Sequence, residues 1–71
     1  MTIEKIRRDI HKNIGNVAVI QHNEGRNRVL EYEGKVIEVY RNIFVIMDNN
    51  SKRSFSYYDV LTDTTKVSFK M

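Results

Sequence analysis

The feature that most constrains the fold is a long strand-like run from Arg26 to Met47. Valine, isoleucine, tyrosine and phenylalanine recur in it, and these side chains pack well on a pleated surface. Gly34 lies in its middle, and a short polar break follows at Arg41-Asn42. The part before this break is about twice as long as an ordinary strand. A strand of that length bends, so the run predicts a small curved β-sheet.

The alternation of side chains changes phase near Gly34. Leu30 and Tyr32 share one face before the glycine, whereas Ile37 and Val39 have the opposite parity after it. A phase change at a glycine is typical of a β-bulge or a sharp bend, and a glycine also has a positive φ available to it. We therefore expect the strand to bend at Gly34 and to serve two parts of a rolled sheet.

Residues 2–14 are predicted to form an amphipathic helix. Four isoleucines recur at steps of three and four residues, which places them on one face, at Ile3, Ile6, Ile10 and Ile14. Thr2 can cap the start, and Gly15 is a natural stop. The helix is expected to cover one face or open end of the sheet. An alternative is a nucleic-acid surface made by the basic residues of the other faces, which Glu4 and Asp9 dilute: Lys5, Arg7, Arg8 and Lys12.

The remaining segments predict five strands, at residues 16–22, 28–40, 43–47, 53–57 and 66–70. Turns are expected at residues 23–25, 40–43 and 48–52, with one helical turn of 3₁₀ type at residues 58–61. No segment reads as a crossover helix, so the sheet is expected to be mostly antiparallel.

These elements predict a mainly β fold. Five strands with one bent member close most simply as a small barrel. The expected architecture is a five-stranded antiparallel SH3-like or Sm-like barrel preceded by one N-terminal α-helix. The length of 71 residues suits one domain. We expect a single domain over residues 1–71, with the helix at 2–14 and the barrel at 16–70.

Composition argues against several function classes. The chain has no cysteine, and neither His11 nor His22 has a second ligand at metal-binding spacing, so we predict no metal site. No nucleophile motif or phosphate-binding glycine loop is present, and we expect no cofactor and no enzyme activity. The longest apolar run, Ile43–Met47, is too short to span a membrane, and no signal peptide is evident. A cytoplasmic protein without membrane contact is expected.

The candidate contact residues are basic and aromatic, and most lie in or beside predicted loops. They are Arg26, Arg28, Arg41, Arg53, Tyr57, Tyr58 and Asp59. Basic loops with interleaved aromatics often hold single-stranded nucleic acid, but the same pattern suits a solvated or protein-facing surface. Asp59 beside two tyrosines admits acid–base chemistry, although a cap on the predicted helical turn is the simpler role.

Several of these motifs resemble the Veg family, small proteins of Gram-positive bacteria of the Bacillus and Clostridium groups. The resemblance covers most of the chain, through Gly25-Arg26-Asn27-Arg28, Glu33-Gly34, Tyr40-x-x-x-Phe44-Val45-Ile46 and Arg53-Ser54-Phe55-Ser56-Tyr57-x-Asp59-x-Leu61-Thr62. Asn27 departs from the family, which more often has a basic residue there, and Arg41 stands where proline is common. The resemblance implies a regulatory role linked to biofilm formation, through relief of a transcriptional repressor of matrix genes.

Two hypotheses follow. In the first, the chain is a protein-interaction module that modulates a transcription regulator, with Arg26, Arg28, Tyr57, Tyr58 and Asp59 as contact residues. In the second, it is a small barrel that binds nucleic acid through the loop arginines and lysines and nearby tyrosines. A homodimer is compatible with either, because a small barrel can leave strand edges unpaired.

Overall fold

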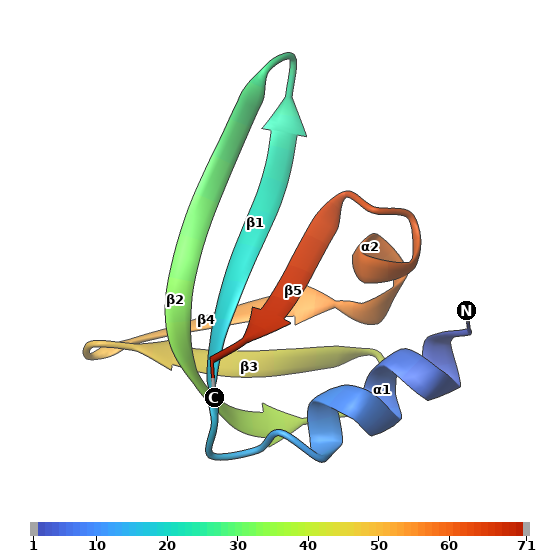
Figure 1. The fold of residues 1–71 in the computed structure, drawn as a ribbon, viewed down its shortest axis with the longest axis vertical. Helices are drawn as coiled ribbons and strands as arrows, with labels where there is room; N and C mark the ends of the chain where they lie inside the picture. Colours follow the sequence, from blue (N-terminus) through green and yellow to red (C-terminus); the bar gives the residue numbers. More distant parts are fainter. Residues whose placement is uncertain (1, 71) are drawn as a thin grey trace.

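A computed structural model describes residues 2–70; Met1 and Met71, which the predicted domain includes, lie outside it. The elements follow the order α1 (Ile3–His11), β1 (Val17–Gly25), β2 (Arg28–Val39), β3 (Ile43–Asp48), β4 (Ser51–Ser56), α2 (Tyr57–Leu61) and β5 (Thr65–Phe69). All strand pairs are antiparallel, in the spatial order β4-β3-β2-β1-β5 (Figure 1). This confirms the mainly β class, with an N-terminal helix and a five-stranded antiparallel sheet.

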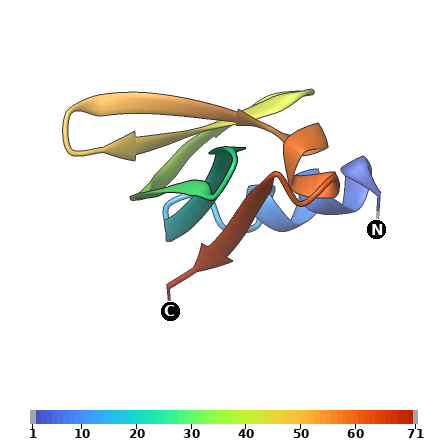
Figure 2. The same cartoon turned by 90° about the horizontal axis from the view of Figure 1, so that it is seen from above.

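The predicted closed barrel is wrong, because the sheet has two free edges. β4 and β5 lie at opposite ends of the strand order, and no ladder joins them within residues 2–70. The short helix α2 occupies the connection between β4 and β5 and separates the two strands (Figure 1). The sheet is therefore curved but open. Seen from above, β4 forms its outer margin, and the β3–β4 hairpin extends away from the helices (Figure 2).

The bend of the sheet depends on β2, which pairs with β1 along its first half and with β3 along its second half. The irregularity in the β2–β3 ladder lies between Val36 and Glu38, so the extra residue is Ile37 and not Gly34. Gly34 also does not use a positive φ. Its small size is needed instead, because a Cβ atom there would lie 2.5 Å from the carbonyl oxygen of Met47. The expectation of a glycine-driven bend at Gly34 is corrected accordingly.

The core lies between the sheet and α1. Ile6 and Ile10 from α1 belong to one buried cluster with side chains of β1 to β4: Ala18, Ile20, Val36, Phe44, Ile46 and Phe55. The helix ends at His11, three residues before the predicted end, and Ile14 is 45% exposed as a result. The predicted 3₁₀ turn is the α-helix α2, whose first residue, Tyr57, is fully buried in the same core.

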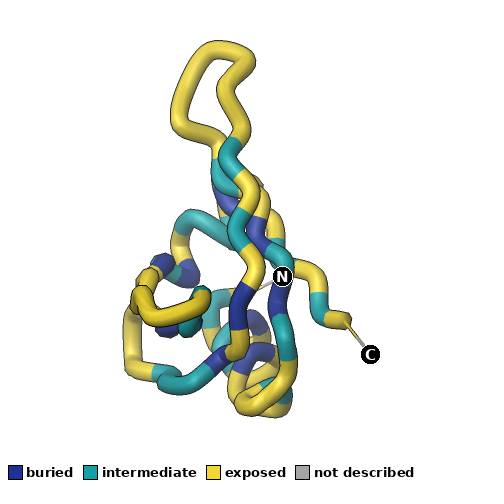
Figure 3. Tube along the Cα trace, turned by 90° about the vertical axis from the view of Figure 1, so that its left-hand side faces the viewer, coloured by how far each residue is buried: buried dark blue, intermediate teal, exposed yellow. Residues whose placement is uncertain are grey.

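The β1–β2 hairpin projects from the body of the molecule, and its tip is exposed (Figure 3). Its turn lies at Arg26-Asn27, not at the predicted residues 23–25, and β1 continues to Gly25. Asn27 has a φ of 53° there, a conformation that asparagine tolerates better than most residues. The β3–β4 turn is likewise shorter than predicted, because Asp48 and Ser51 already pair across Asn49-Asn50. The turn at Arg41-Asn42 lies where it is predicted.

Candidate functional site

The candidate site is a groove of about 390 Å³ beside the outer edge of β4. Five consecutive residues of β4, from Lys52 to Ser56, line it. Side chains alternate between the two faces of a strand, so an unbroken lining of this kind means that the groove runs along the strand edge. The opposite wall comes from the projecting hairpin, through His22 and Glu24 of β1 and Tyr32 of β2. Hereafter this is called the β4 groove.

Arg53 is fixed on the inner side of the β4 groove by an aromatic partner. Its guanidinium carbon lies 4.5 Å from the centroid of the Tyr32 ring, a cation–π distance. The Tyr32 ring packs in turn on Phe55, with centroids 5.6 Å apart. His22 completes the aromatic wall: its ring is 6.0 Å from Phe55, and its Nδ1 lies 2.7 Å from the hydroxyl oxygen of the buried Thr65. The wall is therefore held by core contacts.

The end of the β4 groove is formed by α2. Ser56 caps this helix, because its hydroxyl oxygen accepts a hydrogen bond from the Asp59 backbone N–H at 3.1 Å. The expected capping role of Asp59 thus belongs to Ser56. Asp59 lies in the first turn of α2, where a carboxylate suits the positive end of the helix dipole. Asp59 also lines the β4 groove.

The structure brings together only part of the predicted contact set. Arg53 and Asp59 share the β4 groove. Arg26 and Arg28 lie at the exposed tip of the projecting hairpin, and Tyr58 is 62% exposed on α2. Tyr57 is fully buried, and its hydroxyl donates a hydrogen bond to the Tyr40 carbonyl oxygen at 2.7 Å. Its side chain belongs to the core and is not accessible to a partner.

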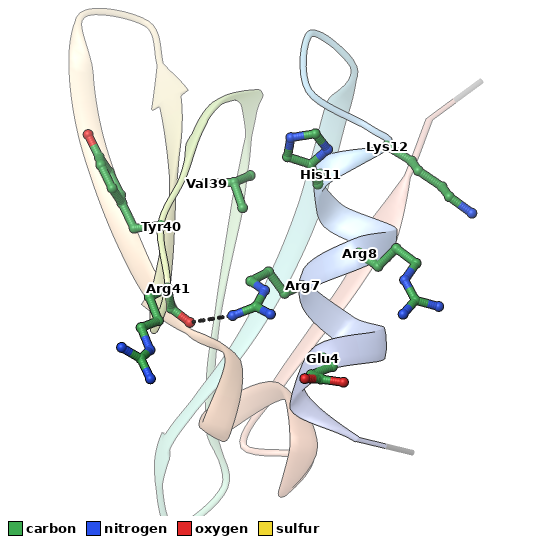
Figure 4. Close-up of a pocket in the computed structure, with 8 residues that line it drawn as sticks. All are labelled: Glu4, Arg7, Arg8, His11, Lys12, Val39, Tyr40 and Arg41. Carbon is green, nitrogen blue, oxygen red and sulfur yellow. Dashed lines mark hydrogen bonds between the residues drawn. The ribbon is translucent and has the colours of Figure 1, made fainter.

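Arg41 belongs to a second, basic cleft of about 640 Å³ between α1 and the β2–β3 turn (Figure 4). His11, Val39 and Tyr40 line this cleft together with four cations and one carboxylate: Arg7, Arg8, Lys12, Arg41 and Glu4. Arg7 reaches across the cleft and donates to the Arg41 carbonyl oxygen at 3.5 Å. Arg8 and Lys12 point away from the turn, so the cations spread over a surface rather than converging on one point (Figure 4).

Two tyrosines near this cleft have perturbed pKa values. Burial raises the pKa of Tyr57, and the nearby positive charge of Arg7 offsets part of that effect. Interaction with the Glu38 carboxylate raises the pKa of Tyr40. Both shifts favour the neutral phenol, which donates hydrogen bonds and does not act as a base at neutral pH.

Sequence reasoning did not find the partners of Arg53. Tyr32 and His22 lie on other strands, and their approach to β4 depends on strand register and sheet curvature. The sequence does carry one indication of these partners, which is the alternation of side chains along β1 and β2. Ile20 pairs with Tyr32 and His22 pairs with Leu30, so alternate residues of both strands lie on one face of the sheet. The sequence identifies Arg7, Arg8 and Lys12 as a candidate nucleic-acid surface but does not place Arg41 beside them, because α1 and the β2–β3 turn meet only in the folded chain.

Within residues 2–70, no cluster of three or more histidine, aspartate or glutamate side chains could hold a metal ion. In the same part of the chain, no helix has the length and apolar character that a membrane span requires.

Comparison with known proteins identifies the family. Residues 1–68 match the family model described as biofilm formation stimulator VEG. No curated protein matches the chain. The description of this family names a regulatory effect and not a catalysed reaction. Since the match covers nearly all of its 71 residues, the chain belongs to the VEG family of biofilm formation stimulators.

Proposed function

We propose that this chain is a non-enzymatic, cytoplasmic regulatory protein that modulates a transcription regulator linked to biofilm formation through protein–protein contact. The family supplies the biological process. Contact with a protein is supported by the mixed charge of the β4 groove. Its lining combines Lys52 and Arg53 with Glu24, Asp59 and an aromatic wall.

Mixed charge favours a protein partner at this groove. A polyanion would meet repulsion from Glu24 and Asp59, whereas a protein surface can present both signs of charge to match them. Arginine and aromatic side chains are also enriched in protein–protein interfaces and at their energetic hot spots. The Arg53–Tyr32 pair has this composition and is already ordered by the core beneath it.

The test is affinity capture from the cytosol of the native host, with DNA-binding regulators identified in the captured fraction. The wild-type chain is expected to recover such a regulator, and Arg53→Glu to lose it. Lys35→Glu, which makes the same charge change at an exposed residue outside both the β4 groove and the basic cleft, is the matched control and should retain it. A matrix-gene reporter in the host should respond in parallel. Failure of the wild type to recover any regulator, or equal recovery by both variants, would contradict the proposal.

A second candidate function is nucleic-acid binding, and the basic cleft favours it. Four cations surround that cleft against one carboxylate, and Tyr40 beside them is 51% exposed and able to stack on a base. Binding of mixed single-stranded oligonucleotides should weaken steeply with salt, because each phosphate contact adds about 0.7 to the slope of log affinity against log salt. Arg8→Ala is expected to reduce that slope. Absence of binding at low salt would exclude this function.

A further inference from the structure

We propose that the outer edge of β4 binds an extended segment of a partner protein as an added β-strand, with acidic residues of that segment opposite Lys52 and Arg53. The inference rests on the proposed regulatory function and names how its partner is held. In strand addition, main-chain hydrogen bonds along a sheet edge provide affinity, and contacts with alternate side chains provide specificity.

The backbone of β4 is available for such pairing. On β3, the Ile43 carbonyl accepts from Tyr40 N–H at 2.8 Å, which turns the backbone groups of Ile43 toward β2. Backbone groups alternate sides along an antiparallel strand, so the next residue, Phe44, turns its groups toward β4. In the β3–β4 register, the backbone N–H and C=O groups of Ser51, Arg53 and Phe55 therefore point toward β3. The groups that face the open edge belong to Lys52, Ser54 and Ser56, and no strand within residues 2–70 pairs with them.

The β4 groove would enclose an added strand on one side. Because its far wall is the projecting hairpin, side chains on the inner face of the new strand would lie against Tyr32 and His22. Those on the outer face would lie beside Lys52 and Ser54, which are exposed. A carboxylate therefore suits the inner position opposite Arg53, apolar residues suit the other inner positions of the segment, and polar residues suit the outer ones.

Charge selects an acidic segment over a second copy of this chain. Within residues 2–70 the one ion pair joins Lys70 and Glu33, which leaves Lys52 and Arg53 without a carboxylate partner. A carboxylate opposite them would be attracted. Two copies of the chain, each with a net charge of +3, would repel one another. Glu24 and Asp59 disfavour a uniformly acidic segment, so we infer one that alternates apolar residues with a few acidic ones.

Ser54→Pro tests the backbone directly. Proline removes the Ser54 N–H, which faces the open edge, and proline is tolerated on edge strands when it removes no ladder hydrogen bond. Ser54→Ala keeps the N–H and is the matched control. A display library of random twelve-residue linear peptides is selected on the wild-type chain and measured against both variants. The recovered peptides should carry alternating apolar and acidic residues, bind Ser54→Ala like the wild type, and bind Ser54→Pro about tenfold or more weakly.

Amide hydrogen exchange of the wild-type chain supplies a readout that needs no variant. With a recovered peptide bound, the backbone N–H groups of Lys52, Ser54 and Ser56 should become protected together. No recovered peptide, equal binding to both variants, or protection that misses these three groups would overturn the proposal. Protection that rises with protein concentration in the absence of peptide would overturn it too, in favour of a second copy.

The same variants separate this inference from the proposed function. If Ser54→Pro captures the regulator from cytosol as well as the wild type does while Arg53→Glu fails, contact regulation holds and strand addition fails. If no regulator is captured but peptides bind the edge as described, the proposed function fails while the edge remains a peptide site.

Discussion

At Gly34 the backbones of β2 and β3 approach more closely than any side chain would allow. A Cβ atom at this position would lie 2.5 Å from the Met47 carbonyl oxygen and 2.9 Å from its carbonyl carbon. Both are backbone atoms in a paired strand, so they cannot move away as the end of a flexible side chain could. The requirement is for space and not for an unusual φ.

Gly34→Ala is therefore expected to destabilise the fold by about 1–3 kcal/mol, because the two strands must separate to admit the methyl group. Gly15→Asn is the control: Gly15 has a φ of 90° with no heavy atom within 4 Å of an added Cβ, and asparagine tolerates the left-handed region. Urea unfolding at neutral pH measures both. Equal stability of Gly34→Ala and wild type would contradict the close approach.

Tyr57 makes stability depend on pH in the alkaline range. Because burial raises its pKa in the folded state, the folded chain holds the phenolic proton more tightly than the unfolded chain does. Its contribution is complete below the ordinary tyrosine pKa of about 10 and is lost as pH rises through the folded-state value. Tyr57→Phe should unfold with a smaller loss of stability between neutral pH and about pH 11, and the exposed Tyr58→Phe should follow the wild type. Identical profiles for Tyr57→Phe and wild type would contradict this assignment.

At the scale of the element, α1 contains three of the four isoleucines of the predicted helix; Ile6 and Ile10 are buried, and Ile3 packs against the core as a partly buried side chain. Ile6 and Ile10 are 5% and 2% exposed, whereas Ile14 lies beyond the end of the helix and is 45% exposed. The isoleucine spacing predicts the helix and its buried face. It does not predict where the helix ends, because Lys12 caps it through hydrogen bonds to Arg8 and Ile10 before the fourth isoleucine is reached.

Ile10→Ala is expected to cost about 2–5 kcal/mol, since it removes a buried side chain and leaves a cavity between α1 and the sheet. Ile14→Ala makes the same chemical change at a half-exposed position and should cost much less. Thermal unfolding followed by far-ultraviolet circular dichroism compares the two. A larger loss for Ile14→Ala than for Ile10→Ala would place the contact face of α1 elsewhere.

Much of the element order could be predicted because local patterns specify it. The alternation in β2 and β4, and the polar turns at Arg41-Asn42 and Asn49-Asn50, are readable without tertiary contacts. The bulge at Ile37 is different: it lies two residues past Lys35, where pairing with β1 ends and pairing with β3 begins, and only the register Val36↔Ile46 and Glu38↔Val45 reveals the extra residue. Whether the sheet closes into a barrel also could not be predicted from the sequence, because an open sheet and a closed barrel need the same five strands. Of the candidate site, Arg53 and Asp59 were identifiable, but their common groove depends on sheet curvature.

At the scale of the whole molecule, burial is uneven. The two halves of β2 differ sharply: Gly34 and Val36 are buried, whereas residues 23–29 around the hairpin turn are all exposed. Local opening is easiest where few apolar contacts oppose it. The tip of the projecting hairpin is therefore expected to open more readily than the centre of the sheet, although the hairpin supplies one wall of the β4 groove.

Native-state amide hydrogen exchange should report this gradient. We expect the slowest exchange at Val36 in the centre of the sheet, and fast exchange around Arg26 and Asn27. If ligand binding in the β4 groove orders the hairpin, protection at its Glu24 end should rise as well. Uniform protection along β2 in the free chain would contradict the expected gradient.

The place of β5 in the sheet also has a consequence for the order of folding events. The β1–β2, β2–β3 and β3–β4 pairs join neighbours in sequence, but β5 pairs with β1, and the His22–Thr65 contact spans 43 positions. Closing so long a loop carries an entropy cost that local hairpins avoid, so β5 is expected to dock after the other strands. Val67→Ala should then speed unfolding with little effect on the folding rate in stopped-flow measurements. The docking of β5 would then control the unfolding rate, and with it the lifetime of the folded state.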